Sequence, residues 1–225
     1  MRIYEFGNPG AGSVLVQPVD DHDLGGIENE AGEIARLAGT DFHLIAVRIE
    51  DWNRDLSPWP APAVFGKAAF GGGAEKTLQE LLPLCSDPGR RCYLGGYSLA
   101  GLFALWAASR TDVFAGVAAA SPSLWFPGFS DYMENCVPNC GRVYLSLGDR
   151  EEKTRNPVMA TVGDRIRALA ALLSARGVDC ALEWNPGNHF RDADLRTARA
   201  FAWVLGAKPP VGSEGQQNTR KETAV

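Results

Sequence analysis

Short apolar runs alternate with amphipathic segments along most of the chain. Seven runs are rich in β-branched and aromatic residues, and several of them are apolar throughout. Uninterrupted apolar runs are typical of strands that are buried on both faces of a parallel sheet. The expected strands are residues 2–6, 13–19, 42–49, 91–97, 113–121, 142–147 and 178–184.

Segments with helical periodicity lie between the expected strands. Ile27 and Ile34 are spaced so that they share one face of a helix. Leu78 and Leu82 have the same relation further along the chain. Pro83 should kink or shorten this second helix, because proline has no N–H to donate and its ring clashes with the preceding turn.

The two last helices are marked at their ends. For the first of them, Asn156 is a suitable N-cap, Pro157 suits the first helical position and Gly177 ends the segment. We expect the final helix to begin near Asp194 and to stop at Gly206.

Regular alternation of strands and helices predicts an α/β fold. We expect residues 1–206 to form a single domain with a mostly parallel central sheet, helices on both faces and no large lid domain. Residues 207–225 are polar and lack periodicity, so we expect a disordered C-terminal tail. In such sheets ligands bind at the carboxyl ends of the strands, where the informative residues should therefore lie.

Charge and composition restrict the classes of partner. The formal net charge is −5 over 225 residues, which gives no reason to expect binding to nucleic acid or to an anionic membrane. No run is long and apolar enough to span a bilayer, and the segment "MRIYEFGNPG" lacks the apolar centre of a signal peptide. We therefore expect a cytoplasmic protein. The oligomeric state does not follow from these features.

The cysteines show no framework spacing. They are Cys85, Cys92, Cys136, Cys140 and Cys180. An odd number of cysteines fits reduced thiols in a cytoplasmic protein. Cys136 and Cys140 form a C-x-x-x-C pair, but no second pair follows, so we expect no zinc site and no other metal.

Ser98 lies where an expected strand meets an expected helix. In a nucleophile elbow a serine occupies such a sharp turn, and the residues two before and two after it must be small. Gly96 and Ala100 satisfy that need, and Gly101 follows. The alternative is an ordinary turn in which Ser98 caps the helix.

A serine nucleophile needs a base, which in turn needs an orienting carboxylate. In α/β hydrolases the chain order is serine, acid, histidine, and His189 is the only histidine after Ser98. It lies in a Pro-, Gly- and Asn-containing loop just past the last expected strand. The alternative is a loop histidine with no catalytic role.

The acid should follow the strand at 142–147. Asp149, Glu151 and Glu152 all lie there. In hydrolases of this type the acid usually lies three residues after a strand-end glycine, which favours Glu151. Asp149 and then Glu152 are the alternatives, and at least two of the three should belong to a solvated charge cluster.

The oxyanion hole consists of backbone N–H groups. One donor should be Leu99, directly after the nucleophile, and the other should follow the strand at 13–19, at Val19 or Asp20. The acidic stretch 20–23 is adjacent. We expect it to be a solvated loop, since it lacks further metal ligands.

Four stretches together resemble one family. "GYSLAGL", "SPSLWF", "LGDREEKTRN" and "GNHF" resemble the esterase branch of the α/β hydrolases that includes enterochelin esterases and S-formylglutathione hydrolase-like enzymes. The resemblance covers about residues 13–205. It implies Ser98 as nucleophile, Glu151 as acid and His189 as base, with "SPSLW" beside the acyl pocket. Ala100 in place of glycine and "GNHF" in place of Gly-Gly-His are departures that concern the substrate more than the reaction.

Aromatic residues near the expected sheet edge are candidates for the substrate pocket. They are Trp52, Trp59, Trp125 and Phe126. Either they wall an apolar site or they pack loops together. Since the chain has no long insertion that would form a lid, we expect an open site that suits short or exposed acyl groups.

These features predict a serine hydrolase that cleaves a small-molecule carboxylic ester through an acyl-enzyme intermediate, without a cofactor. Thioester or amide cleavage and acyl transfer use the same catalytic groups and remain alternatives. A non-catalytic protein that uses this fold to bind a partner is another. Family resemblance alone suggests siderophore processing, and the chain lacks a basic cluster for an anionic catecholate.

Overall fold

A seven-stranded sheet runs through the computed structural model, which describes residues 2–207. Its strands are β1 (Arg2–Gly7), β2 (Ser13–Val19), β3 (His43–Arg48), β6 (Arg91–Tyr97), β7 (Phe114–Ala120), β8 (Arg142–Gly148) and β9 (Asp179–Asn185). The strand order is β1-β3-β2-β6-β7-β8-β9, and only β1 pairs in the antiparallel sense. The seven strands expected from the sequence and the mostly parallel sheet are confirmed. The expected tail at 207–225 lies, except for residue 207, outside the described residues.

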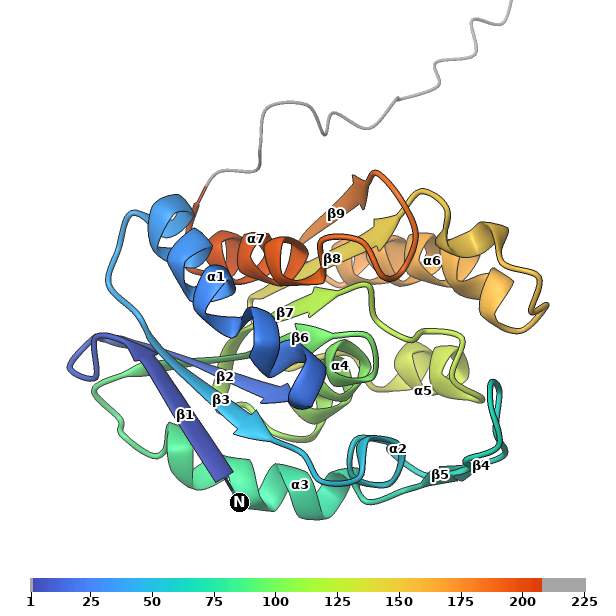
Figure 1. The fold of residues 1–225 in the computed structure, drawn as a ribbon, viewed down its shortest axis with the longest axis horizontal. Helices are drawn as coiled ribbons and strands as arrows, with labels where there is room; N and C mark the ends of the chain where they lie inside the picture. The colour runs from blue at the N-terminus through green and yellow to red at the C-terminus, as the bar shows by residue number, and fades with distance from the viewer. Residues whose placement is uncertain (1, 208–225) are drawn as a thin grey trace, which may run out of the picture.

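Helices cover both faces of the sheet (Figure 1). One face carries α1 (Asp21–Ala38) and α7 (Ala193–Val204), which contact each other. The other face carries α3 (Ala74–Leu81), α4 (Leu99–Arg110), α5 (Phe129–Asn135) and α6 (Val162–Ala175). Side chains alternate between the two cores along each strand, as the pleat requires: on β6, Cys92 and Leu94 belong to the second face, and Tyr93 to the first.

Short elements occupy the connecting loops. They are α2 (Trp52–Asp55), the two-stranded ribbon of β4 (Pro60–Ala61) and β5 (Phe70–Gly71), and the 3₁₀ segments η1 (Leu82–Cys85), η2 (Glu151–Lys153) and η3 (Met159–Thr161). No large lid domain is present in residues 2–207. Nor does any helix in this range combine the length and apolar character needed to cross a membrane.

Two helix boundaries test the predictions that were based on Pro83 and Pro157. Pro83 does end a helix early, since α3 stops at Leu81 and Pro83 lies in the 3₁₀ segment η1. The expected start of α6 at Pro157 is wrong, because the regular helix begins at Val162. Asn156 Oδ1 instead accepts the N–H groups of Val158 and Met159, at 3.0 and 3.2 Å, and so caps a turn that precedes the helix.

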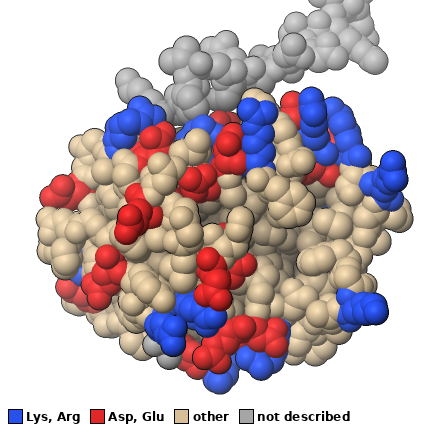
Figure 2. All heavy atoms as spheres, in the orientation of Figure 1, with Lys and Arg blue, Asp and Glu red and all other residues tan. Residues whose placement is uncertain are grey.

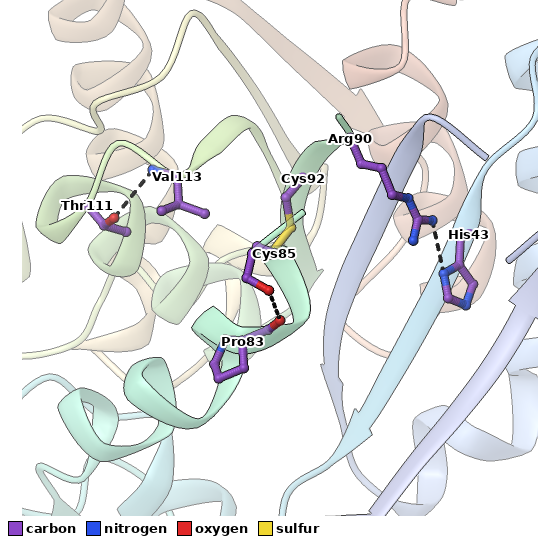
Figure 3. The surroundings of a disulfide bond; sticks show 8 residues. His43, Pro83, Cys85, Arg90, Cys92, Thr111 and Val113 are labelled. Atoms are coloured by element: carbon purple, nitrogen blue, oxygen red, sulfur yellow. Dashed lines mark hydrogen bonds between the residues drawn. A yellow bond between two sulfur atoms is a disulfide. The ribbon is translucent and has the colours of Figure 1, made fainter. Parts of the chain in front are cut away.

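A disulfide corrects the expectation of reduced cysteines. Cys85, at the end of η1, is bonded to Cys92, near the start of β6 (Figure 3). The 3₁₀ turn brings their Cα atoms to 5.5 Å, a normal distance for the bond, which the sequence spacing alone does not reveal. Cys136, Cys140 and Cys180 are free thiols. The cytoplasmic location stays a prediction. It can no longer be supported by the argument that all the cysteines are reduced.

Candidate active site

Ser98 occupies the turn between β6 and α4 in a strained backbone conformation. Its φ and ψ are 57° and −117°, a region that residues with a side chain rarely adopt. The turn is tight enough that a Cβ on Gly96 would lie 2.7 Å from the Cβ of Ala100. The alanine that departs from the usual motif is therefore accommodated because residue 96 is glycine.

Three side chains from distant loops form a hydrogen-bonded line. His189 Nε2 lies 3.0 Å from Ser98 Oγ, and His189 Nδ1 lies 2.7 Å from Glu151 Oε2. Ser98 follows β6, Glu151 follows β8 and His189 follows β9, so all three lie at the carboxyl edge of the sheet. The sequence order and this geometry both match what a serine nucleophile, its base and an orienting acid need.

The second carboxylate oxygen of Glu151 is held by three donors. Its Oε1 accepts hydrogen bonds from the Gly148 N–H at 2.7 Å, Ser121 Oγ at 2.8 Å and Arg196 Nη1 at 3.0 Å. A side chain at residue 148 would not fit, since its Cβ would lie 2.5 Å from the Gly187 carbonyl oxygen. Glu151 is thus fixed at both oxygens.

Arg196 connects the acid to the histidine loop. It lies on α7, is only 1% exposed, and its Nη2 donates to the carbonyl oxygens of Pro186 and Asn188 at 3.2 and 3.1 Å. Its Nη1 also donates to Tyr97 Oη at 3.1 Å, and Tyr97 Oη donates to the His189 carbonyl oxygen at 2.8 Å. One guanidinium group therefore binds Glu151 and the loop that carries His189.

The surroundings keep the Glu151 carboxyl ionised. Burial by itself would raise the pKa of Glu151. The hydrogen bond and charge of His189, with the Gly148 N–H and the Ser121 hydroxyl, outweigh burial and hold the pKa of Glu151 below its usual value. Burial likewise raises the pKa of Tyr97 to about 12, so this phenol stays a neutral donor.

The two other candidate acids have different partners. Asp149 Oδ1 accepts the Gly187 N–H at 2.8 Å, which fixes the start of the histidine loop. Glu152 pairs with Arg167 at 2.9 Å. Of the three acids, only Glu151 hydrogen-bonds to His189 in the described structure.

The expected oxyanion donors are placed as follows. Leu99 is the first residue of α4, so its N–H has no acceptor within the helix. Val19 is the last residue of β2, and its carbonyl accepts the Ile49 N–H. Asp20 is the N-cap of α1, and its N–H donates to Asp23 Oδ2 at a long 3.3 Å.

A cavity of about 480 Å³ opens over Ser98 and His189. Its lining includes Asp20, His22, Asp23, Trp52, Phe65, Tyr97, Trp125, Met159, Phe190 and Ala193. Among the expected pocket residues, Trp52 and Trp125 thus line the cavity, whereas Trp59 and Phe126 do not.

Trp59 and Phe126 pack a loop together instead. Their ring centroids are 5.6 Å apart, and Trp59 Nε1 donates to the Pro127 carbonyl oxygen at 2.9 Å. Phe126 is fully buried against Phe70. Trp59 and Phe126 therefore follow the second interpretation given for the aromatic residues, in which they pack loops together.

The roles of some residues at the site were not predicted from the sequence. Ser123 Oγ lies 3.1 Å from Ser98 Oγ, and Ser121 and Arg196 bind the acid. Ser121 and Ser123 belong to "SPSLWF", one of the four stretches that carry the family resemblance, but the resemblance did not indicate these two hydrogen bonds. Nothing in the sequence marks Arg196, because arginines on helices are usually exposed.

Comparisons with known proteins give matches among solved structures only; no family model and no curated protein matches the chain. Siderophore hydrolase EstA from Aspergillus nidulans matches with a TM-score of 0.62 and 22% identity, over 87% of this chain and 82% of that chain. An IroE-like serine hydrolase from Shewanella oneidensis matches with a TM-score of 0.68 and 16% identity, over 90% and 75%. Enterochelin esterase from Shigella flexneri matches with a TM-score of 0.62 and 17% identity, over 89% of this chain but 54% of that longer chain. At these identities the similarity shows a shared fold.

Proposed function

We propose that this chain, which has the α/β-hydrolase fold, is a serine esterase that cleaves small-molecule carboxylic esters. The observation that carries the proposal is the line from Ser98 Oγ through His189 to Glu151, with separations of 3.0 and 2.7 Å. The strained backbone at Ser98 and the cavity directly above it support the same reaction. One of the structurally similar proteins is an IroE-like serine hydrolase, which agrees with this reaction.

The reaction follows from the positions of these groups. Ser98 Oγ attacks the ester carbonyl while His189 Nε2 takes its proton, and Glu151 stabilises the resulting imidazolium. Collapse of the tetrahedral intermediate breaks the bond to the alcohol, which leaves with the proton from His189. Water, deprotonated by His189, then attacks the acyl-serine. The bond between the acyl carbon and Ser98 Oγ breaks, His189 returns the proton to Ser98 Oγ, and the carboxylic acid is released.

The oxyanion needs N–H donors that are free when the intermediate forms. In our proposal the Leu99 N–H is the first donor and the Asp20 N–H the second, with Val19 ending the strand that presents it. The Asp20 N–H becomes available to the oxyanion when its long hydrogen bond to Asp23 Oδ2 opens. Loss of one such donor typically costs about 10²–10³ in rate.

The test is chemical labelling and turnover with single-residue controls. We expect a fluorophosphonate probe to label the protein, short 4-nitrophenyl esters to be hydrolysed, and Ser98→Ala to abolish both. Labelling that persists unchanged in Ser98→Ala would refute the choice of nucleophile. Absence of both labelling and turnover would favour a non-catalytic binding protein.

The choice of acid is tested by three conservative variants. Glu151→Gln removes the charge that supports the imidazolium, and we expect kcat to fall by about 10³–10⁴-fold. Asp149→Asn and Glu152→Gln serve as matched controls, because they lie on the same loop and have other partners. Equal small losses in all three variants would contradict the assignment.

A further inference from the structure

A second cavity adjoins the one above Ser98. It measures about 390 Å³ and lies between the first turns of α1 and the start of α7. His22, Asp23, Phe190 and Ala193 line both cavities, so the two are neighbours along a shared wall. We call this second cavity the acidic pocket.

Carboxyl groups dominate its lining. The side chains of Asp23, Glu30, Asp192 and Asp194 line the acidic pocket, and no lysine or arginine does so. Figure 2 shows acidic side chains gathered over the N-terminal end of α1 on this face. Asp192 pairs with Arg191 at 3.2 Å. In residues 2–207, Asp23, Glu30 and Asp194 have no such cationic partner.

Glu30 is the least satisfied of these groups. It is only 3% exposed, and its Oε1 has no hydrogen-bond partner in the described structure. Its Oε2 accepts a single long bond, from Gln17 Nε2 at 3.3 Å. Glu30 borders the acidic pocket, although its Oε1 is itself covered by protein atoms. A buried carboxyl without a cation nearby is costly to keep ionised, and such a group is a candidate for ligand binding.

The charges in the acidic pocket also oppose one another. Burial, with the nearby charges of Asp23 and Asp194, raises the pKa of Glu30 well above its usual value. Burial and the charge of Asp20 raise the pKa of Asp23 to about 6. Gln17 of β2 hydrogen-bonds to Glu30, and His22 of α1 lines the same pocket. Without a bound cation, the pocket therefore retains protons that exposed carboxyl groups would lose.

We propose that the acidic pocket binds an ammonium group on one arm of the ester substrate while the ester lies over Ser98. The proposal rests on the esterase function proposed above. An ammonium group in this cavity supplies the positive charge that Asp23, Glu30 and Asp194 lack. Phe190, which is 87% exposed and lines both cavities, offers an aromatic face to the same cation.

An organic cation fits the acidic pocket better than a metal ion does. In residues 2–207 no three acidic, histidine or cysteine side chains converge as metal ligands would. The position beside the cavity of Ser98 also favours a group that is attached to the substrate. The same charges disfavour an anionic arm.

Two pairs of isosteric esters test the proposal, one for each side of the ester bond. On the acyl side, 4-nitrophenyl 4-(aminomethyl)benzoate is compared with 4-nitrophenyl 4-ethylbenzoate. On the alcohol side, 4-(aminomethyl)benzyl acetate is compared with 4-ethylbenzyl acetate. We expect kcat/KM to be at least about tenfold higher for the cationic ester in one of the pairs, as one buried charge–charge contact typically gives.

The variants Glu30→Gln and Asp194→Asn should remove that preference. We expect the cationic-to-neutral ratio to fall to about one, while kcat/KM for the neutral ester changes less than about twofold. Glu33→Gln is the matched control, since Glu33 lies on α1 and pairs with Arg36 on the surface. No cationic preference in the wild-type protein, or a preference that survives both variants, would overturn the proposal.

A binding measurement separates this proposal from the esterase proposal. Benzylammonium is titrated calorimetrically into Ser98→Ala in buffers of different ionisation enthalpy. We expect binding with proton release, tighter at pH 8 than at pH 5, and its loss in Ser98→Ala/Glu30→Gln. Absence of binding overturns the acidic pocket even if neutral esters are cleaved. Binding without any ester turnover supports the pocket and overturns only the esterase.

Discussion

At the residue scale, Arg196 is the part of the site that the hydrolase reaction does not itself require. Its two terminal nitrogens reach the Glu151 carboxylate, the Tyr97 hydroxyl and two carbonyl groups of the histidine loop. A buried arginine with that many acceptors is rigid, since moving it would leave several polar groups unpaired. We therefore interpret Arg196 as a positioning residue that sets the orientation of Glu151 relative to the histidine loop.

Replacing Arg196 should lower kcat more than it changes KM. In Arg196→Met the Glu151 carboxylate and the histidine loop lose the donor that binds both of them. We expect kcat to fall about 10–100-fold through misalignment, while KM changes little because Arg196 does not line the cavity above Ser98. Steady-state kinetics with short 4-nitrophenyl esters measure both constants.

Controls separate positioning from general damage. Arg196→Lys keeps the charge but loses the planar fork, so its kcat should also fall. Arg199→Met changes an arginine on the same helix whose partners are Asn185 and Glu183, and it should leave kcat within about twofold of wild type. An unchanged kcat in folded Arg196→Met would contradict the positioning role.

At the scale of elements, the disulfide lies away from the site. It joins η1 to β6 near the amino end of that strand, whereas Ser98 follows the carboxyl end. On the other side of β6, Arg90 contacts His43 at 3.2 Å (Figure 3). The region around the bond is thus part of the framework and not of the chemistry.

Removing this bond should lower stability and spare activity. In the chain-entropy view, opening a loop with a sequence separation of 7 costs about 2–2.5 kcal/mol. We expect Cys85→Ala/Cys92→Ala to lose about that much in a urea denaturation experiment. Its kcat/KM on 4-nitrophenyl acetate should stay within about twofold of wild type. A large loss of activity in the folded variant would contradict this separation.

The sequence predicted strands better than helix starts or pocket walls. The seven strands have long apolar runs because both of their faces are buried, and that signal depends only on local residues. The start of α6 was misplaced because Asn156 and Pro157 are also good turn residues. Trp59 and Trp125 look alike in the sequence, and only the packing of distant loops decides which one faces the cavity.

The line of Ser98, Glu151 and His189 was foreseen as a hypothesis because each residue follows a strand. Arg196 was not, since its burial results from three loops and α7 meeting at one point. Residues 20–23 were expected to be a solvated loop, which is wrong: they form the N-cap and first turn of α1, and His22 and Asp23 line the acidic pocket. Glu30 and Asp194 are 164 positions apart in the chain, and only the contact between α1 and α7 brings them to one cavity.

At the scale of the whole molecule, the acidic pocket makes stability depend on pH. Asp23 has a pKa of about 6 in the folded chain and 3.8 as its ordinary value. Between these values the folded chain holds a proton that the unfolded chain has lost. Stability from this group is therefore present at low pH and is lost as the pH rises through about 6.

Asp23→Asn should remove this dependence. The amide keeps an acceptor for the Asp20 N–H but carries no charge. Relative to wild type, we expect a gain of about 1–3 kcal/mol in the free energy of unfolding at pH 8 and almost none at pH 4. Urea denaturation at both values measures it. An equal change at the two pH values would show that Asp23 acts only through its hydrogen bond with the Asp20 N–H.

The arrangement around Arg196 also divides the molecule into two parts that can evolve separately. The acid and the base are tied to α7, whereas Trp52, Phe65, Trp125 and Met159 reach the cavity from other loops. Mutations that reshape this aromatic wall to accept a new acyl group should leave Ser98, His189 and Glu151 aligned. Directed evolution of substrate range should therefore accumulate its changes in those wall loops, while position 196 stays invariant.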